Sequence, residues 1–482
     1  MKTILRKTAI KASIVLFVFS MLSGTLFAQT SARKTTIISI QDTVKASDIK
    51  LYLKSSSDLL YPLATGRMYE NGYKPVWFSH STTENALWDA LMLLDCSLQF
   101  GLNHHDYHAD QLTYSNLREI ASHKDLQLAA RLDVLLTDAM LAFISHLHYG
   151  KLNSLYTSPT TDQADFRGFR ADSTLKRALV SRDFGVVVAD AQPTYIGYQE
   201  LQTLMRLITG QYIGDSYEVS AETVKLIAVN LERWRWEKPE NKTHVSINIP
   251  SFTLRYIHEQ NYQEFKVVVG KPSSPTPVLS STIGYFTTAP DRTVSQKSLL
   301  YDRRGNTISS DPINLIRVKS NIADYIIKQS PACDNALGRI AFNFSNNYNI
   351  YLHDTPDRNL FDKTDRAFSN RCISMENPEE FAKLLLKADH VSENTFGELH
   401  HAMENYQKKR FTLKTPVPVH IRYITCEMKD GLLEIYKDVY QQDKKISNDL
   451  FGSNELLITE IKEFIKKKEL GFNYQRSPVA QK

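Results

Sequence analysis

The apolar residues of this 482-residue chain change their spacing near Pro239, and this change constrains the fold class most strongly. Before it, apolar side chains recur every three or four positions, as on one face of a helix. The clearest such run predicts a helix that ends near Gly150 and comprises Leu132, Leu135, Leu136, Ala139, Met140, Phe143 and Leu147. A second helix is predicted over 223–236, with its inward side formed by Leu226, Val229 and Trp234.

After Pro239 the apolar residues alternate with polar ones, which predicts strands. Three predicted strands carry Val245 to Ile249, Phe252 to Tyr256 and Phe265 to Val269, and a further β segment covers 417–428 beyond a helical stretch at 379–410. We therefore predict an α+β chain, with a mostly helical domain at 46–236 and a β-rich domain with flanking helices at 240–443. Residues 444–482 form a charged tail in which NELLITEIKEFIKKK predicts one amphipathic helix.

The first 28 residues have the layout of a secretory signal peptide. Four basic residues precede an apolar run from Ile14 to Leu22, and small residues lead to a cleavage point after Ala28. The alternative is a membrane anchor, but the run is shorter than the roughly 20 residues that span a bilayer. We expect export. Cleavage lowers the net charge from +5 to +1, because the segment holds four basic residues and no acidic one, so charge gives no support for nucleic-acid binding.

Four cysteines remain, at positions 96, 333, 372 and 426. Their spacing contains no C-x-x-C pair and therefore predicts neither a zinc site nor a redox motif. The spacing alone leaves undecided whether Cys333 and Cys426 form a disulfide. A thiol that stays reduced in an exported protein would point to catalysis.

His353 and Cys372 are candidates for a base and a nucleophile within YLHDTPDRNLFDKTDRAFSNRCISM. A thiolate is the reactive form of cysteine, and a nearby imidazole can accept the thiol proton. His353 ends an alternating run, and Cys372 precedes the helix signal NPEEFAKLLL beside Arg371, which would favour a thiolate. The alternative is a structural thiol and an unrelated histidine, and spacing alone favours that alternative.

Two other polar clusters have a functional and an ordinary interpretation. HHDYH at 104–108 offers His104, His105 and His108 as metal ligands, but no second segment supports them, so a polar turn is favoured. Four aspartates could form a cation site, and solvated turns are the favoured interpretation for Asp354, Asp357, Asp362 and Asp365.

Several segments together resemble one family. IYLHDTP and RAFSNRCISMENPEE resemble the catalytic motif of L,D-transpeptidases, whose YkuD-type domain places a histidine ahead of the cysteine segment. LLTDAMLAFISHLHYGKL resembles the helical scaffold domain of the large Gram-negative branch. NLERWRW, VVVGKP, NALGRIAF and VPVHIRYIT resemble further segments, so the likeness runs from about residue 50 to 443.

The resemblance implies a peptidoglycan acyltransferase that joins tetrapeptide stems by 3→3 cross-links, without metal or cofactor. Cys372 would be the nucleophile and His353 the general base, oriented by a backbone carbonyl. The resemblance also implies a substrate and oxyanion neighbourhood, which would comprise Tyr351, Ser369, Asn370, Arg371 and Ser374. The expected partners are stem peptides and other cell-wall synthesis proteins, not nucleic acid, and the expected location is the periplasm, at the cell wall.

The chain departs from the family pattern at four places. Arg371 replaces a glycine, Ser374 replaces an arginine or asparagine, and Arg292 replaces an aromatic residue. Only about twenty residues separate YQELQTLMRLI from NLERWRW, so we expect the peptidoglycan-binding module of large relatives to be absent. These departures motivate an alternative, a catalytically impaired paralogue that binds or scaffolds the wall. A Cys372 sulfur far from His353, or an Arg371 side chain that fills the cleft, would favour it.

Overall fold

The computed structural model describes residues 44–78, 84–123, 125–210, 219–238, 241–259, 261–290, 292–294, 315–318, 326–329 and 337–452. The predicted signal peptide, Cys333 and the predicted helix at 454–468 lie outside these residues. The chain forms two compact units, which divide after Trp236; residues 446–452 group with the first unit. No helix among the described residues is long and apolar enough to cross a membrane.

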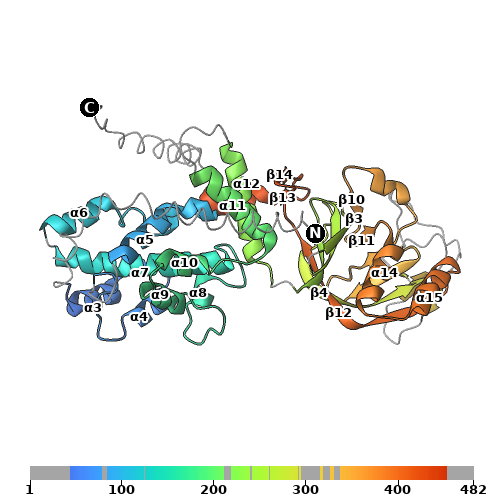
Figure 1. The fold of residues 1–482 in the computed structure, drawn as a ribbon, viewed down its shortest axis with the longest axis horizontal. Helices are drawn as coiled ribbons and strands as arrows, with labels where there is room; N and C mark the ends of the chain where they lie inside the picture. The colour runs from blue at the N-terminus through green and yellow to red at the C-terminus, as the bar shows by residue number, and fades with distance from the viewer. Residues whose placement is uncertain are drawn as a thin grey trace, which may run out of the picture. The chain divides into compact units, whose positions relative to one another are not determined.

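The first unit is helical (Figure 1). Its α-helices are α3 (Ala46–Ser55), α4 (Pro62–Met68), α5 (Glu84–Asp95), α6 (Tyr114–His123), α7 (Leu126–Tyr149), α8 (Ser158–Thr161), α9 (Ala171–Leu179), α10 (Phe184–Ala189), α11 (Ile196–Gly210) and α12 (Ala221–Arg235), with 3-10 turns η1 (Ser97–Phe100) and η2 (His104–Asp106). Helix α16 (Asp443–Phe451) crosses the boundary between the units.

Helix α7 is the centre of this unit and confirms the predicted helix. Asp125 caps its start by accepting hydrogen bonds from the Gln127 and Leu128 amides at 3.1 and 3.0 Å. Gly150 ends it with φ +85°, a conformation that glycine adopts without strain. Helices α3, α4, α5 and α9 pack around it, so α7 is buried on nearly every side. A helix enclosed in this way must satisfy each polar side chain internally.

Two buried carboxylates of α7 hold neighbouring backbone segments. Asp138 is fully buried and accepts hydrogen bonds from the amides of Leu60 and Tyr61, both at 2.8 Å, and from the Thr65 hydroxyl at 3.0 Å. The Nε2 atom of His108 lies 2.7 Å from the same carboxylate. Asp133, one turn earlier, accepts from the amides that follow α4, those of Val76, Trp77 and Phe78. These bonds attach the segment before α4 and the segment after α4 to helix α7.

His146 should make this unit sensitive to acid. It is buried, its Nδ1 lies 3.1 Å from the Tyr107 hydroxyl, and burial lowers its pKa from 6.5 to about 3. Because the unfolded chain binds this proton at higher pH, stability falls as pH drops from 6.5 toward 3. We expect a loss of about 2 kcal/mol by pH 5 from this group. Thermal unfolding of the native chain and of His146→Gln, measured from pH 7 to 4, checks this; equal pH slopes would contradict it.

The second unit is β-rich, which confirms the predicted α+β class. Its strands are β1 (Thr243–Asn248), β2 (Thr253–His258), β3 (Asn261–Gly270), β4 (Leu279–Thr288), β5 (Arg292–Val294), β6 (Leu315–Val318), β7 (Ile326–Gln329), β8 (Ile340–Phe344), β9 (Leu352–His353), β10 (Ala367–Ser369), β11 (Ile373–Met375), β12 (Arg410–Arg422), β13 (Cys426–Lys429) and β14 (Leu432–Ile435). The helical segments are η3 (Arg358–Asp362), α14 (Pro378–Ala388) and α15 (Glu393–Glu404).

The main sheet closes on itself through β3. Its order is β10-β3-β11-β9-β8-β4-β12-β1-β2, and β2 also pairs with β3. The long strand β3 makes this closure possible, because residues 261–266 pair with β2 while Val267 and Val268 pair with β11. The interior is apolar, and α14 contributes Phe381, whose ring lies 4.8 Å from that of Phe342. Strand β11 is therefore held on both sides within a closed sheet.

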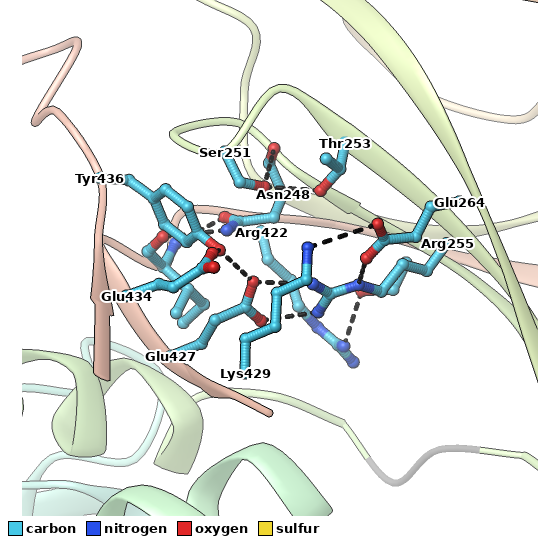
Figure 2. A network of polar contacts seen from close by, with 12 residues as sticks. Asn248, Ser251, Thr253, Arg255, Glu264, Arg422, Glu427, Lys429, Glu434 and Tyr436 are labelled. Atoms are coloured by element: carbon cyan, nitrogen blue, oxygen red, sulfur yellow. Dashed lines mark hydrogen bonds and ion pairs between the residues drawn. The ribbon is translucent and has the colours of Figure 1, made fainter. Parts of the chain in front are cut away.

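A polar network fastens the hairpin of β13 and β14 to this sheet (Figure 2). Arg255 on β2 forms a bidentate ion pair with Glu427 on β13, at 2.6 and 2.8 Å, and a second pair with Glu264 on β3 at 2.7 Å. Tyr436 donates a hydrogen bond from its hydroxyl to Glu427 at 2.7 Å. Burial is the larger cause, and the hydrogen bond to this carboxylate the next, of the raised pKa of the Tyr436 phenol. Every charge named here has an opposite partner, so the network serves structure.

Candidate active site

Parallel pairing of β9 with β11 places His353 beside the cysteine segment. Ser374 is the register partner of His353, and Ile373 is the partner of Leu352. Side chains of paired residues share a face, and residues two apart in a strand share a face as well. Cys372 precedes Ile373 and therefore points to the side that holds Ser374 and His353. A separation of 19 positions in the sequence becomes proximity across two strands.

His353 and Cys372 line one cavity of about 830 Å³. Its other lining residues come from the end of β3, the segment after His353, and β10 and β11, and they include Lys271, Thr355, Lys363, Phe368, Ser369, Asn370 and Ser374. His353 is buried, whereas Cys372 is half-buried and carries a thiol. A reactive sulfur that solvent can reach, next to a buried imidazole, suits nucleophilic catalysis.

A backbone carbonyl fixes the orientation and tautomer of His353. The Nδ1 atom hydrogen-bonds to the carbonyl oxygen of Asp354. A carbonyl only accepts, so Nδ1 carries the proton and Nε2 of the neutral ring keeps its lone pair. His353 can therefore act as a base through Nε2.

Asp354 contradicts the expectation of a solvated turn. Its carboxylate is buried, accepts a hydrogen bond from the Arg339 amide at 2.8 Å, and lies 2.5 Å from the Arg358 guanidinium. Gly338 has φ +61°, and a Cβ there would lie 2.5 Å from the Asp354 side chain. The carboxylate thus anchors the residue whose carbonyl orients His353. Its place directly after the histidine was the only signal in the sequence.

A second hydrogen-bonded group holds the loop before Cys372. Ser369 donates its hydroxyl to the Cys372 carbonyl, and the Lys271 amide donates to the Ser369 carbonyl at 2.9 Å. Thr276 donates its hydroxyl to the Arg371 carbonyl at 2.8 Å and accepts from the Gly270 amide at 2.8 Å. Backbone atoms on both sides of the nucleophile are therefore fixed by β3 and the segment that follows it.

Arg371 occupies a backbone conformation that suits glycine. Its φ is +72°, in the left-handed region that costs a residue with a Cβ roughly 1–2 kcal/mol. The side chain is exposed and is not among the described residues that line the cavity. Within the described part of the chain, no hydrogen bond engages the Arg371 amide. The arginine therefore keeps the turn and leaves the cleft open, so one feature that would favour the impaired paralogue, an Arg371 side chain that fills the cleft, is not seen among the described residues.

Replacing Arg371 with glycine should stabilise the second unit. Glycine removes the left-handed strain, and we expect a gain of about 1 kcal/mol, or roughly 2–4 °C in the Tm of this unit. Calorimetry of the full chain measures it. The matched control is Asn377→Gly, since Asn377 has φ +51° but asparagine tolerates this region. A lower Tm for Arg371→Gly would show that the side chain makes an interaction worth more than the strain.

The other predicted site residues separate into two groups. Asn370 and Ser374 line the cavity with Ser369. Tyr351 is not among the described lining residues and is 38% exposed; its backbone carbonyl accepts a hydrogen bond from the Ile373 amide. Arg292 begins β5, and its side chain lies outside what the structure describes. Among the aspartates, Asp365 pairs with Lys437 at 2.6 Å, and this hydrogen bond holds its pKa below the usual range.

The HHDYH histidines have separate partners. His104 donates from Nδ1 to the Leu94 carbonyl at 2.9 Å, and His108 contacts the buried Asp138. Lys151 lies 2.6 Å from Asp106. No group of three metal-ligating side chains occurs among the described residues. The favoured interpretation as a polar turn agrees with these contacts.

Family comparisons match both units. Residues 64–205 match the model of a Scaffold domain, and residues 242–419 match the model of the L,D-transpeptidase catalytic domain. A curated protein of Haemophilus influenzae named "Putative L,D-transpeptidase" is 23% identical over 439 residues, which cover 86% of this chain and 83% of that protein.

Solved structures give weaker likenesses. The avibactam carbamoyl enzyme of Ldtfm is 11% identical with a TM-score of 0.21, over 38% of this chain. An L,D-transpeptidase from Mycobacterium smegmatis is 13% identical with a TM-score of 0.21, also over 38% of this chain. The alignments span 49% and 58% of those solved chains.

Proposed function

Since this chain belongs to the L,D-transpeptidase family, we propose that it transfers acyl groups between peptidoglycan stem peptides through the Cys372 thiol and forms 3→3 cross-links. One observation supports this proposal above the others. His353 and Cys372 line the same cavity, and the Asp354 carbonyl holds His353 in the tautomer that leaves Nε2 as a base. The same pair of groups can perform both halves of an acyl transfer.

In the first half, Nε2 of His353 takes the thiol proton. The sulfur then bonds to the carbonyl carbon of the third stem residue, an L-centre, and the tetrahedral adduct collapses. The bond from that carbon to the D-alanine nitrogen breaks, and His353 returns the proton to the departing amine. The products of this half are a thioester on Cys372 and free D-alanine.

In the second half, the side-chain amine of another stem attacks the thioester carbonyl. His353 accepts a proton from the attacking nitrogen, the carbon–sulfur bond breaks, and the thiolate recovers a proton. The new amide is the cross-link. Water in place of the amine would give carboxypeptidase activity by the same steps. The bond energy of the original peptide is conserved in the thioester, so the proposal requires no nucleotide, metal or other cofactor.

Backbone amides near Cys372 would stabilise the negative oxygen of each tetrahedral adduct. The left-handed turn at Arg371 supports this role, because its amide has no acceptor among the described residues and adjoins the nucleophile. Ser369 and Thr276 fix the two carbonyls that flank this turn, and a fixed turn keeps its amides aimed without reorganisation.

Intact-mass spectrometry with a purified disaccharide-tetrapeptide tests the proposal. The native protein should gain the acyl mass on Cys372 or release D-alanine with a cross-linked dimer, and Cys372→Ala should do neither. Cys96→Ala is the matched control, since Cys96 is another half-buried thiol, in the helical unit. A folded native protein with a titratable thiol that gives no adduct and no product would contradict transpeptidation and favour a wall-binding role.

We also propose that the protein acts outside the cytoplasm, at the periplasmic cell wall, with stem peptides and other wall-synthesis proteins as partners. The layout of residues 1–28 supports this location. Mass spectrometry of protein recovered from a Gram-negative host would find an N-terminus at Gln29 in the periplasmic fraction, whereas an intact Met1 in the cytoplasmic fraction would contradict export.

A further inference from the structure

Two lysines face the cavity and have no place in the acyl-transfer steps. Lys271 follows β3 directly, and its amide is bonded to Ser369 of the catalytic loop at 2.9 Å. Lys363 caps the end of η3, and its ammonium lies 4.6 Å from the ring centroid of Phe368, which also lines the cavity. The two lysines therefore line the cavity from separate segments.

Neither ammonium is neutralised within the described part of the chain. No ion pair there involves Lys271 or Lys363, although many other lysines of this unit are paired, such as Lys266 with Glu376 at 3.4 Å and Lys383 with Glu379 at 2.8 Å. Among the described residues that line the cavity, Asp357 alone carries a carboxylate, and it is exposed. Ser374, buried on the catalytic face, is neutral. The described lining of the cavity therefore carries an excess of positive charge, which suits an anionic ligand.

We propose that Lys271 and Lys363 form a cationic clamp that selects donor stems by their free carboxylates. The inference rests on the proposed function, because a tetrapeptide donor is what brings carboxylates to this cavity. Its terminal D-alanine carries one carboxylate, and a third residue that is a diamino diacid carries another on its side chain. A lysine at the third position lacks that second group. The clamp thus favours diamino-diacid stems with both groups free.

Binding to a Cys372→Ala chain tests the clamp without any chemistry. Calorimetry would compare four tetrapeptides: both carboxylates free, only the C-terminal one amidated, only the side-chain one amidated, and both amidated. Lys271→Gln or Lys363→Gln removes one charge-assisted hydrogen bond and should weaken binding of the free donor about tenfold to a hundredfold. Binding of the doubly amidated donor should not change. Arginine at either position should restore most of the affinity.

The matched control is Lys266→Gln, which removes an equal charge from β3 outside the cavity. The singly amidated donors show which carboxylate each lysine binds. A lysine-to-glutamine substitution should not change the affinity for a donor in which the carboxylate bound by that lysine is already amidated. Equal affinity of the free and doubly amidated donors, or a Lys266→Gln effect as large as those of the cavity lysines, would overturn the clamp. Failure of the proposed function is distinct from either outcome: it is the absence of a thioester on the native chain.

Discussion

We expect His353→Gln to slow the proposed thioester formation at Cys372 by about a thousandfold, in a protein that stays folded and binds the donor normally. General base catalysis contributes factors of this order. Glutamine retains an amide donor for the Asp354 carbonyl, so the local hydrogen bond can persist. It has no basic nitrogen to take the thiol proton, and the loss therefore falls on the chemical step.

Rapid-mix intact-mass spectrometry measures this rate directly. His258→Gln is the matched control, because this exposed histidine ends β2 outside the cavity and its Nδ1 hydrogen-bonds to the Thr243 hydroxyl at 2.9 Å. It should acylate at the native rate. A His353→Gln rate within threefold of the native rate would show that another group ionises the thiol. If the Tm of His353→Gln lay far below the native value, the donor-binding data would decide whether the slower rate reflects lost folding or lost base catalysis.

Asp138→Ala should destabilise the helical unit by roughly 3–5 kcal/mol. The substitution leaves the Leu60 and Tyr61 amides and the Thr65 hydroxyl without their acceptor, and Tyr61 and Thr65 are buried where water cannot replace it. It also deprives His108 of its partner. A loss of this size approaches the whole stability of many domains.

Chemical denaturation followed by far-ultraviolet circular dichroism measures this loss. Asp183→Ala is the matched control: Asp183 is exposed and caps α10 with one bond, to the Val186 amide at 3.1 Å. Loss of such a cap costs about 1 kcal/mol. If Asp138→Ala cost no more than the control, the segments around α4 would be held by apolar packing instead of by this carboxylate.

Local patterns predicted much of the fold. The three-and-four spacing identified α7 with its end at Gly150, and alternation identified β1, β2 and β3. The helical stretch at 379–410 is two helices, α14 and α15, because His390 takes a positive φ that interrupts it. Predicted inward residues also held in part: Val229 and Trp234 are buried, whereas Leu226 is half-buried.

Long-range pairing could not be predicted in the same way. The spacing of His353 and Cys372 favoured an unrelated pair, and only the parallel register of β9 and β11 shows that they share a face. The turn chemistry of aspartate predicted solvent for Asp354, yet Gly338 makes room for its burial. Lys271 and Lys363 carried no local signal, because a cavity formed by separate segments is a property of the tertiary structure.

The closed sheet has a consequence for when the candidate active site can form. Strand β1 pairs in parallel with β12, Val245 opposite Val419, and the Tyr440 hydroxyl donates to the Gly270 carbonyl at 2.6 Å beside the catalytic loop. Contacts between such distant parts of the chain form slowly and close only after the later segment exists. A growing polypeptide that already contains Cys372 therefore still lacks a finished catalytic cavity. The thiol gains these surroundings only when residues up to about Tyr440 have been synthesised and have folded, so the proposed reaction requires the chain through Tyr440.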